Sequence, residues 1–374
     1  MKHNTLNITF LNPSVTFHRF TKRISLINAE GINCSVLAYE RNQYPGKVLP
    51  FDFISLGTIK HGAYVYRLLK LFHSVIQVRK NIRFAHYIYA FGLDMVLLGW
   101  IASFFNGRKI PIVYEVGDIR EVFLKSGLIG KVARRIDKFF SKQSKIIVVT
   151  SSAFAKEYFI NRLRISGVRI FEIENKLDKS ILHKSSISPH TQNNNQMIIG
   201  YYGVIRCQRS WTILKEIIQK SNGKIALDVR GVPVNIPTFI EDCAKIENIN
   251  YYGSYISPDD LPKMYNSIDL VWVVGLHGND NHLWAKRCRF YEAGLFKKPM
   301  IGQIGSMDGK IIEKYGLGMV FDFKIMEEVI HGINSIKFQQ LEEWTKNINR
   351  MPEDSFVYTN EHTKLVKIMK NMLT

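Results

Sequence analysis

Short runs of apolar residues alternate along the chain with longer stretches in which apolar residues recur every three or four positions. Short runs bounded by polar turns are typical of buried strands, and the longer period is typical of amphipathic helices. In the first half, strand-like runs cover residues 6–11, 34–39, 53–56, 85–90, 110–116, 145–150 and 170–173, with helical patterns at 16–30, 93–105 and 130–142. This alternation predicts an α/β domain built on a parallel sheet with helices on both faces.

A polar segment, 185–196, interrupts the pattern and reads SSISPHTQNNNQ. We interpret it as an interdomain linker, although a long surface loop inside one domain would read the same way. The alternation then resumes, with strand-like runs at 197–202, 225–230, 249–252, 270–274 and 299–304, helical patterns at 210–220, 258–266 and 291–296, and a last amphipathic helix at 356–373. The prediction is two Rossmann-like doubly wound domains, 1–184 and 197–345, facing a cleft, and a helical segment, 346–374, that packs back on the first domain.

The composition agrees with two cores and indicates an anionic partner. The chain has 374 residues, 46% of them hydrophobic, and a formal net charge of +19. Such a charge suits nucleic acid, an acidic membrane or a phosphorylated substrate. No recognition-helix, RNP or zinc-finger pattern is present, so we do not expect a nucleic-acid partner, and a basic nucleic-acid-binding protein remains the alternative of a different class.

The cysteines and the apolar runs indicate the cellular compartment that we expect for the protein. The four cysteines are scattered and lack the spacing of a zinc site, which suggests free thiols in a reducing cytoplasm and no bound metal. The N-terminus lacks a secretory pattern, and the run at 95–105 is shorter than the ~18–20 residues that span a bilayer. We therefore expect a cytoplasmic protein that is soluble or peripheral on the inner face of the membrane.

Two basic clusters in the second half lie where a predicted strand runs into a helix. The first contains Gly203, Arg206 and Arg209, and the second contains Lys286, Arg287 and Arg289, with Glu292 just beyond. Glycine lets the backbone approach a ligand, and arginines at a helix N-terminus can bind phosphate oxygens. Cations for a diphosphate and one carboxylate for the hydroxyls of a ribose indicate a nucleotide-sugar site. Solvated basic loops, with Glu292 paired to an arginine, are the alternative.

Several segments of the second half, taken in order, are similar to the donor domain of GT-B glycosyltransferases. The segments are YYGVIR, ALDVRG, INYYGSYISPDDLPKMYNSIDLVWV and CRFYEAGLFKKPMIG. They resemble family 4, the "group 1" transferases, over about residues 197–322. The first half resembles that family more loosely, through AHYIYAFGLD, IPIVYEVGDIRE and SKIIVVTSSAFAKEYF.

The resemblance implies roles for individual residues. Arg206 and Arg209 would steady the donor diphosphate, Glu292 would bind the ribose, and the backbone around Tyr255 and Ile256 would meet the base. Two positions depart from the family pattern. Trp284 stands where a second glutamate is common, and Phe91 stands where a histidine is common in the loop after the fourth strand.

The resemblance also implies a reaction. A hexosyltransferase would move a sugar from a nucleoside-diphosphate donor, UDP- or GDP-linked, to a glycan or lipid-linked acceptor in bacterial surface-polysaccharide synthesis. Cations such as Arg206 would stabilise the leaving diphosphate without a metal or other cofactor. The resemblance favours retention of the anomeric configuration. An inverting enzyme would need a general base, for which Asp118 and His18 are the candidates, although either residue could be structural.

A basic stretch of the first half suggests contact with a membrane. Residues 60–83 carry six lysines and arginines and no acidic residue, interleaved with apolar and aromatic side chains. Such a helix suits an anionic membrane surface, although an ordinary helix packed on the sheet with its basic side in water would look similar.

A GT-B-like epimerase or phosphorylase is the enzymatic alternative to a transferase.

Overall fold

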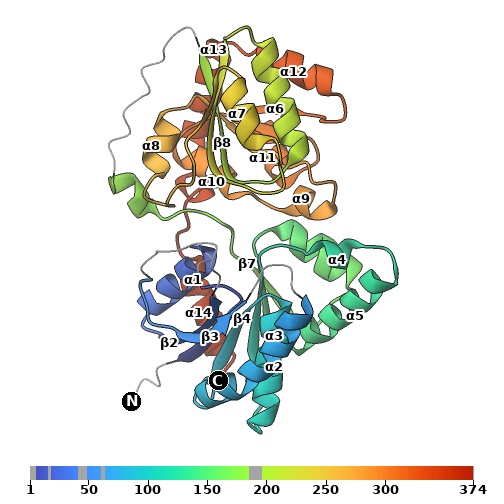
Figure 1. The fold of residues 1–374 in the computed structure, drawn as a ribbon. Helices are drawn as coiled ribbons and strands as arrows, with labels where there is room; N and C mark the ends of the chain where they lie inside the picture. The colour runs from blue at the N-terminus through green and yellow to red at the C-terminus, as the bar shows by residue number, and fades with distance from the viewer. Residues whose placement is uncertain (1–5, 16–17, 41–48, 60–63, 185–195, 374) are drawn as a thin grey trace. The chain divides into compact units, whose positions relative to one another are not determined.

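The computed structural model divides the chain into two compact units, each built on one parallel sheet. The structure describes residues 6–15, 18–40, 49–59, 64–184 and 196–373. The first unit is Met1–Glu174 with Asn360–Thr374, and the second is Asn175–Thr359 (Figure 1). The predicted pair of Rossmann-like doubly wound domains is confirmed.

The first unit is built on a seven-stranded sheet. Its strands are β1 (Asn7–Asn12), β2 (Asn33–Glu40), β3 (Ile54–Thr58), β4 (Tyr87–Phe91), β5 (Ile112–Val116), β6 (Ile146–Val149) and β7 (Arg169–Glu172), in the spatial order β3-β2-β1-β4-β5-β6-β7. Every residue of β4, β5 and β6 is buried. Because helices cover both faces of a parallel sheet, such central strands are continuous apolar runs rather than alternating ones.

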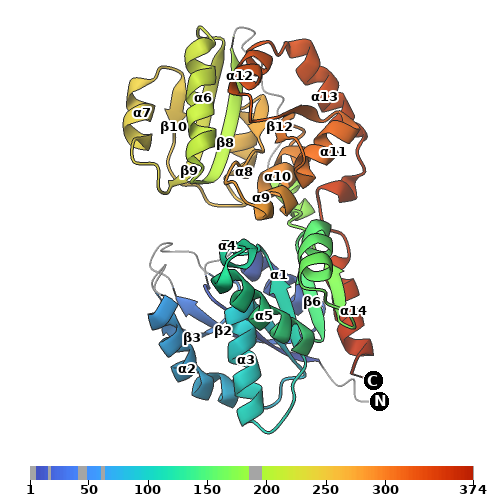
Figure 2. The same cartoon turned by 90° about the vertical axis from the view of Figure 1, so that its right-hand side faces the viewer.

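Helices cover both faces of this sheet. They are α1 (His18–Ala29), α2 (Tyr64–Asn81), α3 (Leu93–Phe105), α4 (Glu121–Leu124), α5 (Leu128–Gln143), the π-helix η1 (Phe154–Arg162) and α14 (Glu361–Asn371). Helices α1 and α14 pack together into one core with the sheet. Helices α2, α3 and α5 lie side by side on the other face (Figure 2).

A buried polar network ties α14 to the first sheet. Arg23 of α1 forms two hydrogen bonds with the carboxylate of Glu115 in β5, at 2.9 and 3.0 Å. The same guanidinium donates to Nε2 of His362 in α14 at 2.5 Å, and the Tyr89 hydroxyl also donates to Glu115. Arg23, Glu115 and His362 are all buried. The network therefore pairs one buried cation with one buried anion and holds His362 in its neutral form.

We expect this network to make stability depend on pH through His362. Burial and the charge of Arg23 lower the pKa of His362 from 6.5 to about 2. Below pH 6.5 the unfolded chain binds a proton that the folded chain does not, so this contribution to stability is lost as the pH falls. The loss at about pH 5 is about 2 kcal/mol.

Urea unfolding at a series of pH values measures this loss. In His362→Gln the free energy of unfolding should fall less between about pH 7 and about pH 5 than in the unmodified protein, by about 2 kcal/mol. His331 on the second unit is exposed, so His331→Gln is the matched control and should keep the full pH dependence. Equal slopes in the two variants would contradict the assignment.

The second unit is built on a six-stranded parallel sheet. Its strands are β8 (Met197–Ile205), β9 (Ile225–Pro233), β10 (Ile249–Tyr251), β11 (Leu270–Trp272), β12 (Met300–Gln303) and β13 (Gly318–Phe321), in the order β10-β9-β8-β11-β12-β13. From β8 the chain continues to β9 on one side, and from β11 it continues to β12 on the other. The strand order therefore reverses between β8 and β11, which is where open α/β sheets bind ligands at their carboxyl ends.

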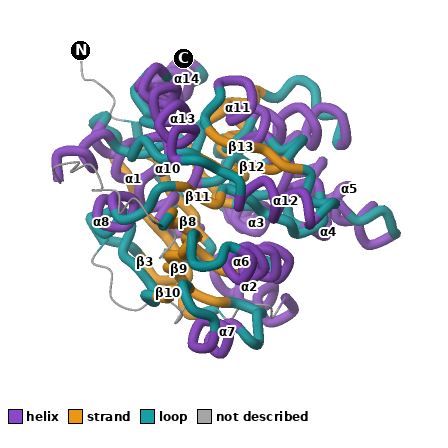
Figure 3. The backbone as a smooth tube through the Cα atoms, turned by 90° about the horizontal axis from the view of Figure 1, so that it is seen from above, coloured by secondary structure: helices purple, strands orange, loops and turns teal. Residues whose placement is uncertain are grey.

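Two apolar cores enclose this sheet. The helices of the unit are η2 (Lys179–Lys184), α6 (Gln208–Lys220), α7 (Phe239–Lys245), α8 (Leu261–Asn266), α9 (Asp280–Trp284), α10 (Cys288–Leu295), α11 (Met307–Tyr315), α12 (Met326–Asn334), α13 (Phe338–Arg350) and η3 (Glu353–Ser355). Helices α6 and α12 contribute to one core and α8, α10 and α11 to the other. Figure 3 shows α6 and α8 on opposite sides of the strands.

The division between the units differs from the one expected from composition. The first unit ends at Glu174, and residues 175–184 belong to the second unit. The reason is backbone pairing, because Leu177 donates its N–H to the carbonyl of Phe356 and forms a parallel bridge with Val357. Of the proposed linker, residues 185–195 lie outside the described residues. The expected boundary at 345 falls inside α13, and α14 rather than the whole segment 346–374 lies in the first unit.

Candidate functional site

Cationic side chains gather at the carboxyl ends of β8 and β11, where the strand order of the second sheet reverses. The loop after β8 carries Arg206, and the loop after β11 carries His277. Arg289, in the first turn of α10, donates to the carbonyl of Val274 just beyond β11, at 3.4 Å. The two basic clusters of the sequence therefore meet, in part, at the ligand-binding position of the fold.

The paired arginines of the first cluster have different surroundings. Arg206 is exposed on the loop that enters α6, and its charge acts on both His277 and His282. Arg209 lies within α6 and donates to the carbonyl of Phe323. Phe323 follows β13, so the side chain of Arg209 reaches from α6 towards the β13 end of the sheet, whereas Arg206 lies on the loop after β8.

Gly203 lies in β8 with a φ of 106°, which favours glycine. A Cβ added there would meet no atom within 4 Å, so the space beside this residue is open. The crowded position is Gly231 of β9, where an added Cβ would lie 1.7 Å from the Gly203 carbonyl oxygen.

Arg289 is the best-oriented cation of the cluster. Its guanidinium lies over the ring of Tyr201 in β8, 5.1 Å from the centroid. Its second terminal nitrogen, Nη1, is buried without a hydrogen-bond partner in the part of the chain that the structure describes. A buried unpaired donor on a cation is costly, and an anionic ligand oxygen would satisfy it.

Glu292 is a buried carboxylate beside this cation, on the same helix. The Tyr265 hydroxyl donates to its Oε2 at 2.6 Å, and this is its one hydrogen bond among the described residues. Burial raises the pKa of Glu292, and the charge of Arg289 opposes that rise. One carboxylate oxygen is thus held by Tyr265, and the other can accept from a ligand hydroxyl.

Two histidines form a part of the site that the sequence analysis did not identify. The rings of His277 and His282 lie 4.3 Å apart between centroids. Burial and the neighbouring arginines lower the pKa of His277 to about 4, and burial together with His277 and the arginines lowers that of His282 to about 3. Both rings are therefore neutral near pH 7. Burial is the larger cause of both low pKa values, and the charges of Arg206 and Arg287 add to it, so the rings lie in a buried and positively charged surrounding.

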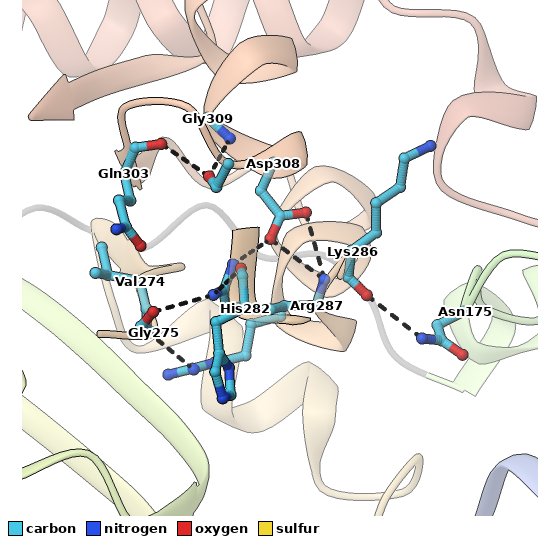
Figure 4. Close-up of polar contacts among 11 residues, drawn as sticks. Asn175, Val274, Gly275, His282, Lys286, Arg287, Gln303, Asp308 and Gly309 are labelled. Carbon is cyan, nitrogen blue, oxygen red and sulfur yellow. Dashed lines mark hydrogen bonds and ion pairs between the residues drawn. The ribbon is translucent and has the colours of Figure 1, made fainter. Parts of the chain in front are cut away.

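Arg287 was expected to bind the diphosphate with its neighbours, but it is a structural residue. It donates to the buried Asp308 of α11 at 2.8 Å and to the carbonyl of His282 at 2.8 Å (Figure 4). Asp308 also accepts from the backbone N–H of Arg287. The side chain of Lys286 extends away from Arg287 in Figure 4. This pair fixes the turn between α9 and α10 and so positions Arg289.

The segment expected to meet the base lies before α8. Tyr255 is half-buried, and burial together with the charge of Glu292 raises its pKa. The N–H of Ile256 donates to the carboxylate of Asp260 at 2.6 Å, and its carbonyl accepts from the N–H of Asp260. The backbone of Ile256 is therefore engaged in its own turn, which leaves Tyr255 as the better candidate.

The candidates of the first unit are less well defined. Asp118 is exposed just beyond β5, and the guanidinium of Arg19 lies against the preceding Gly117. His18 is the first residue of α1, and its side chain lies outside the described residues. Phe91, where the resemblance suggests a histidine, is buried and packs against Phe20 with ring centroids 5.9 Å apart. Phe91 is thus part of the core.

The histidine pair had a weak signal in the sequence. Residues 277–282 read HGNDNH, which the sequence indicates only as a polar loop. The structure shows that this segment includes the start of helix α9. Tyr201 and Tyr265 had no recognisable signal in the sequence, because a buried tyrosine cannot be distinguished there from other core residues. In the described parts of the chain no group of three or more His, Cys, Asp or Glu is arranged to hold a metal ion.

Two units, each built on one parallel sheet with helices on both faces, make up the architecture of the GT-B fold. Solved structures share it: a glycosyltransferase from Rickettsia africae ESF-5 (13% identity, TM-score 0.72) covers 100% of this chain and of its own. HepE from Anabaena in complex with UDP (15% identity, TM-score 0.72) covers 98% of this chain and 100% of its own.

A curated relative matches along nearly the whole sequence. The chain is 22% identical over 370 residues to the succinoglycan biosynthesis protein ExoL of Rhizobium meliloti (strain 1021), which covers 94% of this chain and 90% of ExoL. No protein-family model matches the chain. The GT-B fold expected from the sequence is confirmed by the structural likeness.

Proposed function

We propose that the protein is a glycosyltransferase that moves a sugar from a nucleoside-diphosphate donor to a glycan or lipid-linked acceptor in bacterial surface-polysaccharide synthesis. The observation that carries this proposal is the buried Nη1 of Arg289, which has no hydrogen-bond partner among the described residues, beside the buried carboxylate of Glu292. A cation and a carboxylate side by side suit the diphosphate and the ribose of one ligand. The likeness to ExoL over nearly the whole length of both proteins supports a role in exopolysaccharide synthesis.

UDP is the donor nucleotide that we propose. HepE, which shares the fold, has been solved with UDP and with UDP-glucose. In this chain, Arg206 and Arg289 would bind the diphosphate oxygens, and the neutral rings of His277 and His282 would line the same positive pocket. Glu292 would accept from the ribose hydroxyls while Tyr265 holds its other oxygen.

We propose that the guanidinium groups, without a metal ion, stabilise the charge that develops on the leaving diphosphate. Fixed cations aimed at developing charge lower the barrier most when they are held in place before the reaction, as Arg289 is by Tyr201 and Val274. Retention of the anomeric configuration is proposed from the family resemblance. Asp118 and His18 remain the candidates for a general base if the configuration is inverted.

A thermal-shift screen against UDP, GDP, CDP and ADP tests the donor site, because a ligand of the native state raises the melting temperature with its affinity. We expect UDP to give the largest shift. In Glu292→Ala the affinity should fall about tenfold or more, since one charge-assisted hydrogen bond contributes about 1.5–3 kcal/mol. Glu313→Ala, which removes an exposed carboxylate from α11, is the matched control and should bind as the unmodified protein does.

The reaction itself needs a separate assay with donor and acceptor. Transfer should continue in the presence of a chelator, and NMR of the product should show the donor's anomeric configuration. A donor sugar that is epimerised without an acceptor would support the epimerase alternative instead. If no nucleotide shifts the melting temperature, or if Glu292→Ala leaves the UDP shift unchanged, the proposed donor site is wrong.

A further inference from the structure

Helix α5 of the first unit carries its apolar residues on the outside. Five large apolar side chains are exposed, and we call them the α5 stripe: Leu128 (76%), Ile129 (73%), Val132 (44%), Ile136 (46%) and Phe139 (48%). The buried residues of the helix include Asp137, whose carboxylate accepts from the hydroxyls of Tyr114 at 3.0 Å and Tyr158 at 2.5 Å. A helix packed in the usual way would bury the stripe and expose the acid.

The stripe is continuous, and a row of cations borders it. At about 100° per residue, its five members fall within an arc of about 100° on the helix. Lysines and arginines occupy the adjoining arc of about 60°, on the side away from the buried face. They are Lys131, Arg135, Lys138 and Lys142. Asp137 is the one acidic residue between residues 122 and 156, so all of the exposed charge on α5 is positive.

The apolar surface extends from α5 onto the end of α3. The ring of Phe139 meets Trp100 at 6.0 Å between centroids, and Trp100 stacks on Phe104 at 6.2 Å. Phe104 and Phe105 are 69% and 57% exposed. Helices α3 and α5 lie side by side (Figure 2), so these rings and the stripe form one surface. Exposed apolar patches of this kind on a monomer mark interaction sites.

The positive charges beside the α5 stripe favour one kind of partner over another. A second copy of the chain paired through the same surface would bring two cationic rows together, which is repulsive. An anionic bilayer suits both parts, because apolar side chains enter the boundary between headgroups and acyl chains while lysines and arginines meet the phosphates. In the part of the chain that the structure describes, no helix is long and apolar enough to cross a bilayer.

We infer that α5, with the end of α3, docks the protein on an anionic membrane, lying parallel to its surface. The inference rests on the proposed function in so far as a lipid-linked acceptor would be found there. This docking surface differs from the one expected from the sequence, which was the basic helix within residues 60–83. Of α2, the structure describes the side chains from Lys70 onward, and there Phe72 and Ile76 are exposed as a smaller apolar pair.

Flotation of the full chain with vesicles tests this inference. One set of vesicles contains phosphatidylglycerol and phosphatidylcholine in equal parts, and the other contains phosphatidylcholine alone. We expect binding to the first set that weakens as the salt rises from about 0.1 M to about 1 M, because surface charge is screened. Weak or no binding to the second set is expected, because the cationic row then has no anionic lipid to meet.

Two triple variants separate the apolar and charged contributions. Leu128→Gln/Ile129→Gln/Val132→Gln should lower the partition coefficient at least tenfold at every salt concentration. Its control is Phe72→Gln/Ile76→Gln on α2, which should bind nearly as the unmodified protein does. Lys131→Gln/Arg135→Gln/Lys142→Gln should lower it roughly 100-fold at low salt, since each cation at a surface contributes about 1 kcal/mol. Its control, Lys220→Gln/Lys224→Gln/Lys346→Gln, removes the same charge from the second unit.

Each result has a definite meaning. Binding that survives both α5 variants, or binding that the α2 variant alone abolishes, would overturn the inference. So would a dimer in sedimentation that the α5 variants dissociate, if the vesicles are not bound. UDP affinity is measured in parallel and should be unchanged in the α5 variants. If UDP does not bind but the vesicles do, the proposed donor site fails and the docking surface stands.

Discussion

Arg289→Ala is expected to lower kcat about 100- to 1000-fold, as removal of one pre-organised charge from a transition-state site does. The reason is the position of the guanidinium, which lies over the ring of Tyr201, donates to the carbonyl of Val274 and has one buried nitrogen without a partner in the described segments. Arg289→Lys should recover little, because an ammonium group cannot stack on the ring and bond to two partners in the same plane. Steady-state kinetics with saturating donor measures the effect.

Arg209→Ala is the matched control for that experiment. Arg209 is also an arginine at a strand-to-helix turn of the second sheet, but it donates to the carbonyl of Phe323. Its loss should change kcat only a few-fold. Equal losses in Arg209→Ala and Arg289→Ala, or a change of less than tenfold in Arg289→Ala, would show that the diphosphate does not lie between β8 and β11.

Glu115→Ala is expected to have the largest effect on stability. It leaves the buried guanidinium of Arg23 without its anion and the Tyr89 hydroxyl without its acceptor. Breaking a buried ion pair by removing one partner costs about 3–5 kcal/mol. For a unit of this size each kcal/mol corresponds to about 2–4 °C, so the melting temperature of the first unit should fall by about 6–20 °C. Calorimetry of the full chain measures this.

Glu121→Ala provides the comparison. Glu121 pairs with Lys125 at 3.4 Å, and both side chains are well exposed, so its loss should be nearly neutral. Replacing both buried partners, in Arg23→Met/Glu115→Leu, should recover much of the stability lost in Glu115→Ala, because no uncompensated charge remains. If the single and double variants are equally destabilised, the loss comes from packing rather than from the unpaired cation.

The fold could be predicted well where local sequence carries the information. The fully buried strands β4 and β6 are continuous apolar or aromatic runs, and β5 is one apart from Glu115, so their existence follows from that pattern. The strand β13 was missed, because its apolar run is only three residues long, Met319 to Phe321, and is interrupted by Gly318 and Asp322 on either side. Helix α9 was missed for a similar reason, since five residues are too few to establish a helical period.

The sequence predicted which types of residue would lie in the candidate site, but not how those residues are arranged. Glu292 and Arg289 lie together as the spacing on one helix requires. Arg287, two residues before Arg289, points to Asp308 instead. The partner that decides this lies 21 residues further along the chain, on another helix. The same holds for Arg209, whose carbonyl partner is 114 residues away.

The sequence by itself determined the two α/β domains, the strongly positive net charge and the residues from which a diphosphate site could be built. These depend on local periodicity, net charge and residue chemistry, all of which a chain carries before it folds. Only the tertiary structure decided that Arg287 pairs with Asp308 while Arg289 lies over Tyr201, brought His277 and His282 together, and turned the apolar side of α5 outward. Those outcomes depend on contacts between distant segments, because a side chain's role is set by the partner that folding places beside it.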